Sequence, residues 1–175
     1  MKTADMVLRY LVMVFSGFFL SIFYIVFTPA TVYPVYWLLK IFYSAGLSGL
    51  ILTVNGKEIE IINACIAGAA YFLLLALNLS TRNIFLKKRV KILLVSFSAF
   101  LILNIARIFL LSVLLINEAF FFDIAHLLFW YVLSVLFVFL IWIFTAKIFR
   151  IKEIPFISDF CYLKKEIKSH HKGRK

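Results

Sequence analysis

The sequence predicts an all-α polytopic membrane protein with about four transmembrane helices, an interfacial or re-entrant segment on the outer side and a short outer β-hairpin. Of the 175 residues, 65% are hydrophobic and 15% are charged, and the mean hydropathy is +1.05. A water-soluble domain does not carry so large a share of apolar side chains. Too few residues remain outside the spans for a second folded domain, so residues 1–175 are expected to form a single membrane domain.

Four stretches almost free of charged residues each reach the ~20 residues that cross a bilayer. They lie near Tyr10–Phe27, Ile61–Ser80, Ile92–Ile116 and Ile124–Ala146. Sixteen of the 19 basic residues fall on one side of these spans, Lys40 and Lys57 fall on the other, and Arg107 lies inside a span. Basic residues concentrate on the cytoplasmic side. We therefore expect a multi-pass protein of the cell membrane with both termini cytoplasmic, and we assign the net charge of +11 to topology rather than to nucleic-acid binding.

The segment Thr28–Val54 is hydrophobic, but it contains Pro29 and Pro34 and is rich in tyrosine and tryptophan. If it crossed the membrane, the basic loop that follows residue 80 would move to the outer side. Aromatic residues of this kind are typical of the membrane interface. The composition favours an interfacial or re-entrant segment on the outer face, and the sequence leaves open whether residues 28–54 span the membrane.

A short hairpin is expected directly before the second span. Two β-prone runs flank Asn55-Gly56, a dipeptide suited to the positive φ angles of a type I′ turn. An ordinary polar loop is the alternative, since a lone hairpin is marginally stable in water. Either way, the chain enters the second span within about one turn of Cys65.

Cys65, Arg107 and His126 are the chemically reactive residues inside the spans. Cys65 and His126 each lie about one helical turn from the outer face, and Arg107 lies about ten residues, or ~15 Å, before Asn117. The long arginine side chain can reach toward the outer surface, so all three are expected to converge in one outer-leaflet pocket. Asn104 lies three residues before Arg107 on the same helix face, where it can hold the guanidinium.

Each of the three residues alone has a structural interpretation. A cysteine can be an inert buried thiol, an arginine can bridge helices or extend toward the membrane surface, and a histidine can bond to a carbonyl. Together they supply a nucleophile, an electrostatic stabiliser and a proton acceptor, the groups needed for hydrolysis or acyl transfer. In this interpretation Cys65 is the nucleophile, Arg107 stabilises the oxyanion or orients the substrate, and His126 transfers the proton.

Other chemistries lack their residues. The second cysteine, Cys161, falls in the basic tail from Lys147 to Lys175, and without a C-x-x-C pair redox shuttling is not expected. The motifs of serine and zinc proteases are missing. His170-His171 in the tail lack a third ligand, so we predict neither a metal site nor a cofactor and assign no role to Cys161 or His170.

The order of these residues resembles the archaeosortase/exosortase family. The resemblance rests on Ala64-Cys65 at a helix start, on Asn104-Ile105-Ala106-Arg107-Ile108, and on His126 at the start of the last span. It covers residues Leu52–Phe144, and the short length resembles the small archaeal members of the pacearchaeosortase type. Many members follow the cysteine with Ser/Thr-Gly, whereas this chain has Cys-Ile-Ala-Gly.

This resemblance implies an intramembrane cysteine protease-transpeptidase. Its partners would be secreted or surface proteins whose C-terminal sorting signal consists of a short motif, a transmembrane helix and a basic cluster. Cleavage would form a thioester on Cys65, and the product would then pass to an acceptor, for which a membrane lipid is a candidate. Arg107 and His126 would take the family's arginine and histidine roles. The sorting motif, the acceptor and the oligomeric state do not follow from the sequence.

A non-catalytic membrane scaffold or transporter subunit is the competing interpretation. In it, Arg107 would pair with Glu118 or Asp123 and bind a partner helix or an anionic lipid. This function needs no thiol. The reactivity of Cys65 therefore separates the two interpretations.

Overall fold

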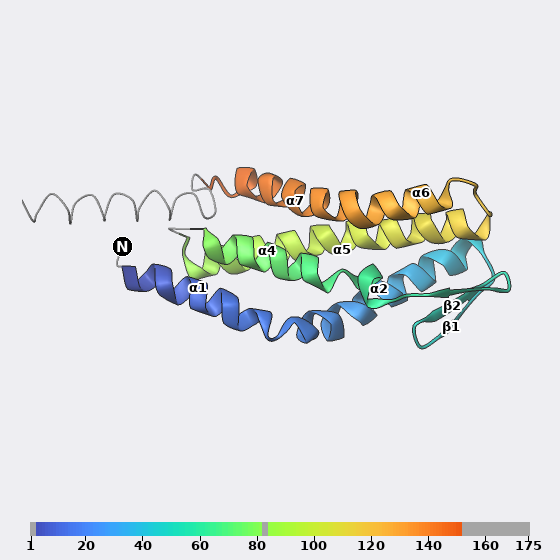
Figure 1. The fold of residues 1–175 in the computed structure, drawn as a ribbon, viewed down its shortest axis with the longest axis horizontal. Helices are drawn as coiled ribbons and strands as arrows, with labels where there is room; N and C mark the ends of the chain where they lie inside the picture. The colour runs from blue at the N-terminus through green and yellow to red at the C-terminus, as the bar shows by residue number, and fades with distance from the viewer. Residues whose placement is uncertain (1–2, 82–83, 152–175) are drawn as a thin grey trace, which may run out of the picture.

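The helices form one elongated bundle with a small β-sheet at one end (Figure 1). The computed structural model describes residues 3–81 and 84–151, so the basic tail with Cys161 and His170-His171 lies outside the described residues. In chain order the elements are α1 (Thr3–Gly17), α2 (Leu20–Phe42), β1 (Ala45–Ser48), β2 (Ile51–Val54), β3 (Lys57–Glu60), α3 (Asn63–Ile66), α4 (Gly68–Ser80), α5 (Leu86–Ile116), α6 (Phe122–Leu127), the π-helix η1 (Leu128–Leu133) and α7 (Ser134–Ile148).

Four helical stretches in the described residues are long and apolar enough to cross a membrane, as the sequence predicted. They are Leu20–Phe42, Asn63–Ser80, Leu86–Ile116 and Phe122–Ile148. Many of their large apolar side chains point outward, with Ile25, Ile102 and Phe144 each at least 60% exposed. An outer surface of this kind is typical of helices that are apolar on all sides and face lipid rather than water.

The first crossing differs from the expected span at Tyr10–Phe27. Helix α1 ends at Gly17, and Phe18 and Phe19 donate to carbonyls only three residues back, at 3.2 Å each. The chain then resumes as α2, which continues through Pro29 and Pro34 to Phe42. Residues 28–42, for which an interfacial or re-entrant segment was expected, are part of this helix, which is long and apolar enough to cross a membrane.

Packing explains why two prolines do not end α2. Thr31, Val32, Val35 and Leu39 are all buried, and α2 packs against α4 and α5. A proline costs one helical hydrogen bond, but neighbouring helices can support such a helix when its surroundings are apolar. The sequence pattern of prolines and interfacial aromatics did not reveal this support.

The hairpin at Asn55-Gly56 is confirmed and forms part of a three-stranded antiparallel sheet in the order β1-β2-β3. Asn55 and Gly56 have φ angles of 49° and 83°, as a type I′ turn requires. Strand β1 was not predicted, because its sequence Ala-Gly-Leu-Ser has no β-branched residue. It is a strand because it pairs with β2 after a turn at Gly49, which has a φ of 63°.

The sheet covers the end of the bundle where α2 and α5 meet. Leu52 and Val54 of β2 are fully buried and pack with Val35 and Leu39 of α2 and Ile108 of α5. Their neighbours on β2, Ile51 and Thr53, are exposed, so one face of the sheet is buried and the other is open. This packing fixes where β3 delivers the chain to Cys65.

The two ends of the bundle carry different loops (Figure 1). The N-terminal end of α1, the C-terminal end of α7 and the α4–α5 connection lie at one end, whereas the sheet and the α5–α6 connection lie at the other. Lys40 in the last turn of α2 and Lys57 in β3 belong to the sheet end. The described basic residues are therefore divided between the two ends as the sequence predicted.

Candidate active site

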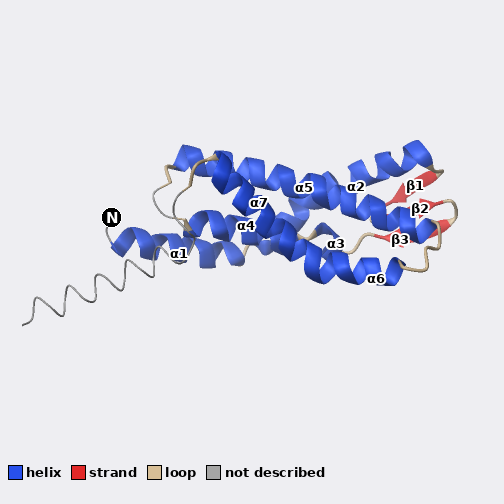
Figure 2. Ribbon diagram, turned by 90° about the horizontal axis from the view of Figure 1, so that it is seen from above, coloured by secondary structure: helices blue, strands red, loops and turns tan. Residues whose placement is uncertain are grey.

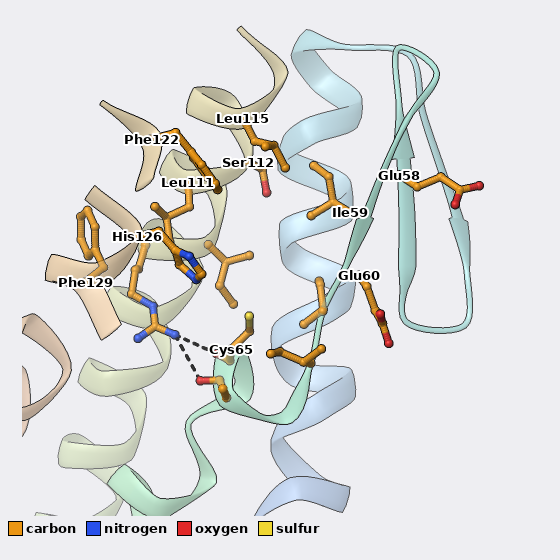
Figure 3. Close-up of a pocket in the computed structure, with 15 residues that line it drawn as sticks. Glu58, Ile59, Glu60, Cys65, Leu111, Ser112, Leu115, Phe122, His126 and Phe129 are labelled. Carbon is orange, nitrogen blue, oxygen red and sulfur yellow. Dashed lines mark hydrogen bonds between the residues drawn. The ribbon is translucent and has the colours of Figure 1, made fainter. Parts of the chain in front are cut away.

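Cys65, Arg107 and His126 line one pocket with a volume of about 240 Å³. The convergence of these three residues, which their positions in the sequence predicted, is confirmed. Strand β3 and helix α3 form one wall of the pocket, and α5 and α6 form the others (Figure 3). The remaining lining residues are Glu58, Ile59, Glu60, Ile61, Ile62, Ala64, Ile108, Leu111, Ser112, Leu115, Phe122 and Phe129.

A break in the second membrane-length helix surrounds Cys65. Helix α3 ends at Ile66, Ala67 takes the left-handed conformation (φ 57°, ψ 41°), and α4 begins at Gly68. The expected helix start near Cys65 is confirmed, and the expected span at Ile61–Ser80 corresponds to the membrane-length stretch Asn63–Ser80, which is interrupted at Ala67. Because the break interrupts the helical hydrogen-bond ladder, carbonyl groups near Cys65 need other donors.

Two side chains of α5 supply these donors. The Asn104 amide donates to the carbonyl oxygens of Cys65 at 2.9 Å and Ile66 at 3.5 Å. The Arg107 guanidinium donates to the carbonyl oxygens of Cys65 at 3.2 Å and Ala64 at 3.5 Å. Asn104 was expected to hold the guanidinium. Instead, the two residues share the Cys65 carbonyl, and the Asn104 Oδ1 atom has no hydrogen-bond partner within the described part of the chain.

The other side of the Arg107 guanidinium is held by the last helical passage. Its second terminal nitrogen donates to Ser134 Oγ at 2.6 Å, and the Ser134 hydroxyl donates to the Phe129 carbonyl at 2.8 Å. Phe129 lies in the π-helix η1, and single π-helical turns are frequent at functional sites. Arg107 is 7% exposed, and its Nε–H is buried without a partner among the described residues.

The scaffold interpretation expected Arg107 to form an ion pair with Glu118 or Asp123, and this expectation is wrong for Glu118. Glu118 Oε1 lies 2.7 Å from Lys57 Nζ, which also donates to the carbonyl of Ile116 at 3.0 Å. The Lys57 ammonium holds the pKa of the exposed Glu118 carboxyl below its usual range. Within residues 3–81 and 84–151, no ion pair joins Arg107 to Asp123 either. Instead, the ion pair between Lys57 and Glu118 joins β3 to the end of α5.

His126 enters the pocket from α6. Its ring stacks on that of Phe122, with the ring centroids 5.7 Å apart and the planes inclined by 18°. Figure 3 shows the His126 ring and the Cys65 sulfur directed into the same space. Both side chains are half-buried, and both line the pocket between the apolar helix face and the polar carbonyls of the break.

Close helix packing supports the break from behind. A Cβ atom at Gly68 would lie 2.8 Å from the ring of Tyr24, so only glycine fits between α2 and α4. One turn further along, the ring of Tyr71 stacks on Phe27 and packs edge-on against Phe100. This close approach at Gly68 holds α4 firmly against α2.

Ala67 offers a stability prediction. A left-handed φ costs an L-residue roughly 1 kcal/mol, whereas glycine adopts it freely. We expect Ala67→Gly to raise the free energy of unfolding by up to about 1 kcal/mol, as measured by thermal unfolding in detergent. The matched control is Ala69→Gly, which lies within regular α4 and should destabilise by roughly 0.5–1 kcal/mol. Equal destabilisation by the two variants would contradict the left-handed assignment.

Ser134 is a site residue that sequence reasoning missed. It is the single serine or threonine between Ile124 and Phe144, and this isolated hydroxyl in an apolar run was the available signal. The sequence also did not predict that β3 is an outer strand whose edge away from β2 is unpaired. Strand order follows from pairing and not from residue types. No group of three or more histidine, cysteine, aspartate or glutamate residues that could hold a metal ion occurs in the part of the chain that the structure describes.

The site thus combines a thiol, an imidazole and a guanidinium in one partly enclosed pocket at a helix break. In enzymes, groups of these three kinds carry out nucleophilic attack on a carbonyl carbon, proton transfer to a leaving group and stabilisation of an oxyanion. The chain matches no family model, no curated protein and no solved structure.

Proposed function

We propose that this protein is an intramembrane cysteine transpeptidase of the archaeosortase/exosortase type, which cleaves C-terminal sorting signals. The observation that carries the proposal is that Cys65, Arg107 and His126, taken from three separate helices, line the same pocket. These residues are far apart in the sequence, so local structure alone does not bring them together. A nucleophile, a proton carrier and a cation in one cavity are the components of covalent acyl transfer.

In the proposed reaction the Cys65 thiol gives its proton to His126 and its sulfur attacks the carbonyl carbon of the scissile peptide. The carbonyl oxygen gains negative charge, which the Arg107 guanidinium stabilises; a substrate oxygen would satisfy its unpaired Nε–H. The C–N bond then breaks, and His126 returns the proton to the departing amine of the tail. An acceptor nucleophile then gives its proton to His126, attacks the thioester and forms a new bond to the acyl carbon. The C–S bond breaks, and His126 returns the proton to the Cys65 sulfur. A membrane lipid is the proposed acceptor.

The substrate is proposed to be a secreted or surface protein that ends in a short motif, an apolar helix and a basic cluster. The bundle's outward-facing apolar side chains suit a substrate helix lying alongside it in the membrane. With the basic end of the bundle in the cytoplasm, the pocket faces the outer leaflet and the substrate's basic cluster stays inside. This orientation places the motif before the substrate helix at the level of the pocket.

Ala67 supports the resemblance at the position where the sequence departs from the family. The family pattern has glycine two residues after the cysteine, which corresponds to Ala67. Ala67 has a φ of 57°, the left-handed conformation that glycine adopts without strain. The departure therefore changes the residue, while the backbone conformation remains one that suits the family pattern.

The test is co-expression of the chain with a candidate reporter bearing such a tail, followed by intact-mass analysis of the reporter. We expect loss of the tail mass and gain of the acceptor mass only when the chain is present. A reporter lacking the apolar helix is the control and should keep its full mass. If a panel of tail-bearing reporters keeps its full mass at normal membrane abundance of the chain, the proposal is wrong.

One observation favours the alternative of a non-catalytic scaffold or transporter subunit. Arg107's described hydrogen bonds go to Ser134 and to main-chain carbonyls, which is what a helix-bridging arginine does. In that case the pocket would take a partner helix or a lipid, and Cys65 would be an inert thiol. Alkylation of Cys65 at mildly acidic pH separates the two, because only an activated thiol reacts there.

A further inference from the structure

We propose that the free edge of β3 binds the segment to be cleaved as an additional β-strand, whose main chain is thereby delivered to Cys65. This inference rests on the proposed function and adds the mode of substrate binding. Peptides that extend an exposed sheet edge gain affinity from main-chain hydrogen bonds and specificity from pockets for alternate side chains. Three features of the sheet end support it.

The first feature is the pairing of β3. Ile59 lies opposite Leu52, and Ile61 donates its N–H to the Leu50 carbonyl at 2.9 Å. Because hydrogen-bonded positions alternate along an antiparallel pair, the main-chain groups of Glu58 and Glu60 face away from β2. Among the described residues, the hydrogen bonds outside the sheet include none to the main-chain groups of Glu58 or Glu60. Strand β3 therefore presents unpaired N–H and C=O groups along one edge.

The second feature is the position of this edge. Sheet order makes β3 an outer strand, and Figure 2 shows it as the strand nearest to α6. Consecutive residues 58–62 line the same pocket as Cys65 and His126. Figure 3 shows β3 running directly into the turn that carries Cys65. A chain paired with β3 would therefore continue to the thiol.

The third feature is that the charged side chains of β3 and the apolar wall of the pocket lie on different sides of this strand. The Glu58 and Glu60 carboxylates point away from Cys65 and His126 (Figure 3), which leaves the main chain to face the pocket. The opposite wall includes the apolar side chains of Leu111, Leu115 and Phe122. An added strand would pair with the main-chain amide groups of this edge. Its alternate side chains would pack against that wall.

The bound strand would run parallel to β3. In the proposed orientation the secreted part of the substrate lies at the sheet end, and its helix extends toward the basic end of the bundle. Strand β3 runs in the same sense, from Lys57 near the end of α5 toward Cys65. This direction places the scissile peptide after the paired residues, immediately before the substrate helix.

The test measures the alkylation rate of Cys65 by intact mass in the full-length chain in detergent, with Cys161 replaced by alanine so that Cys65 is the one remaining cysteine. The two probes are acetyl-trialanyl chloromethyl ketone and acetyl-alanyl chloromethyl ketone; each forms a C–S bond to Cys65 and releases chloride. Only the longer reagent can pair with β3, so we expect it to react about tenfold faster, as for one or two hydrogen bonds. Cys65→Ala should remove the added mass and so confirm the labelled residue.

The Glu60→Pro variant should bring the ratio of the two alkylation rates close to one. It removes the Glu60 N–H from the free edge but keeps the β2–β3 ladder, because that N–H does not face β2. The matched control is Ala45→Pro, which places the same ring at an outward-facing position of the opposite edge strand, β1. It should keep the full ratio.

A second measurement is independent of the proline variant's folding. On the same Cys161→Ala chain with Glu60 in place, N-methylation of the middle alanine of the longer reagent should also bring the ratio close to one. Equal rates for the two unmethylated reagents, or a loss of the ratio in Glu60→Ala as large as in Glu60→Pro, would overturn the strand proposal. These labelling rates do not depend on reporter cleavage, so the strand proposal and the transpeptidase proposal can fail separately.

Discussion

Replacing Cys65 with alanine is expected to abolish processing of a tail-bearing reporter, with a loss of at least about 10³-fold in rate. The variant removes the atom that forms the thioester, and none of the other described residues that line the pocket carries a thiol. Because Cys65 is half-buried and alanine occupies less space, the bundle should lose no more than about 1 kcal/mol in the free energy of unfolding. Intact-mass analysis of the reporter, at equal membrane abundance of the two chains, measures the effect.

Cys161→Ala is the matched control, since it removes the chain's other cysteine and leaves the pocket thiol in place. It should process the reporter at the wild-type rate. Cys65→Ser tests nucleophile identity more narrowly, because a hydroxyl replaces the thiol at almost the same size, and it too should be inactive. Normal processing by Cys65→Ala would eliminate the transpeptidase proposal and favour the scaffold.

Much of the site followed from sequence because depth in a membrane can be counted along a helix. Distances of about one turn for Cys65 and His126 and ~15 Å for Arg107 rest on a fixed rise of 1.5 Å per residue. Charge asymmetry supplied the relative direction of the helices. These two regularities were enough to bring the three residues into one pocket, where the structure has them.

The rest depended on contacts between distant segments. The helix break at Ala67 is stabilised by Asn104 and Arg107, which lie about 40 residues away in α5, so no local signal announces it. Strand β1 exists because of its partner β2, since its own residues have low β-propensity. Likewise, α2 continues past Pro29 because its buried face packs against α4 and α5. Tertiary packing overrode local preference in each case.

These contacts also change the meaning of the two polar residues on α5. The buried stripe of α5 includes Asn104, Arg107, Ile108 and Ser112, so both donors face the bundle interior. Together they hold the carbonyl of the residue that carries the thiol. Arg107 therefore positions the Cys65 main chain even before any substrate is present. A test of its catalytic role must separate this positioning from stabilisation of the oxyanion.

Arg107→Lys is expected to reduce processing by about 10²–10³-fold, the loss typical of one oxyanion donor. Lysine keeps the charge, but its single ammonium cannot donate in a planar fork to Ser134 on one side and to the Cys65 carbonyl on the other. The lost hydrogen bonds should also lower the free energy of unfolding by about 1–3 kcal/mol. Reporter processing and thermal unfolding in detergent measure the two effects.

Asn104→Ala separates the two roles, because it removes the other side-chain donor to the same Cys65 carbonyl and leaves the guanidinium intact. If Arg107 acts on the substrate, Arg107→Lys should lose far more activity than Asn104→Ala for a similar loss of stability. If both variants lose activity only in proportion to stability, Arg107 is a positioning residue, and the oxyanion must be held by another donor. If Arg107→Lys is fully active, the planar guanidinium is not required, and a single positive charge next to the helix break is sufficient.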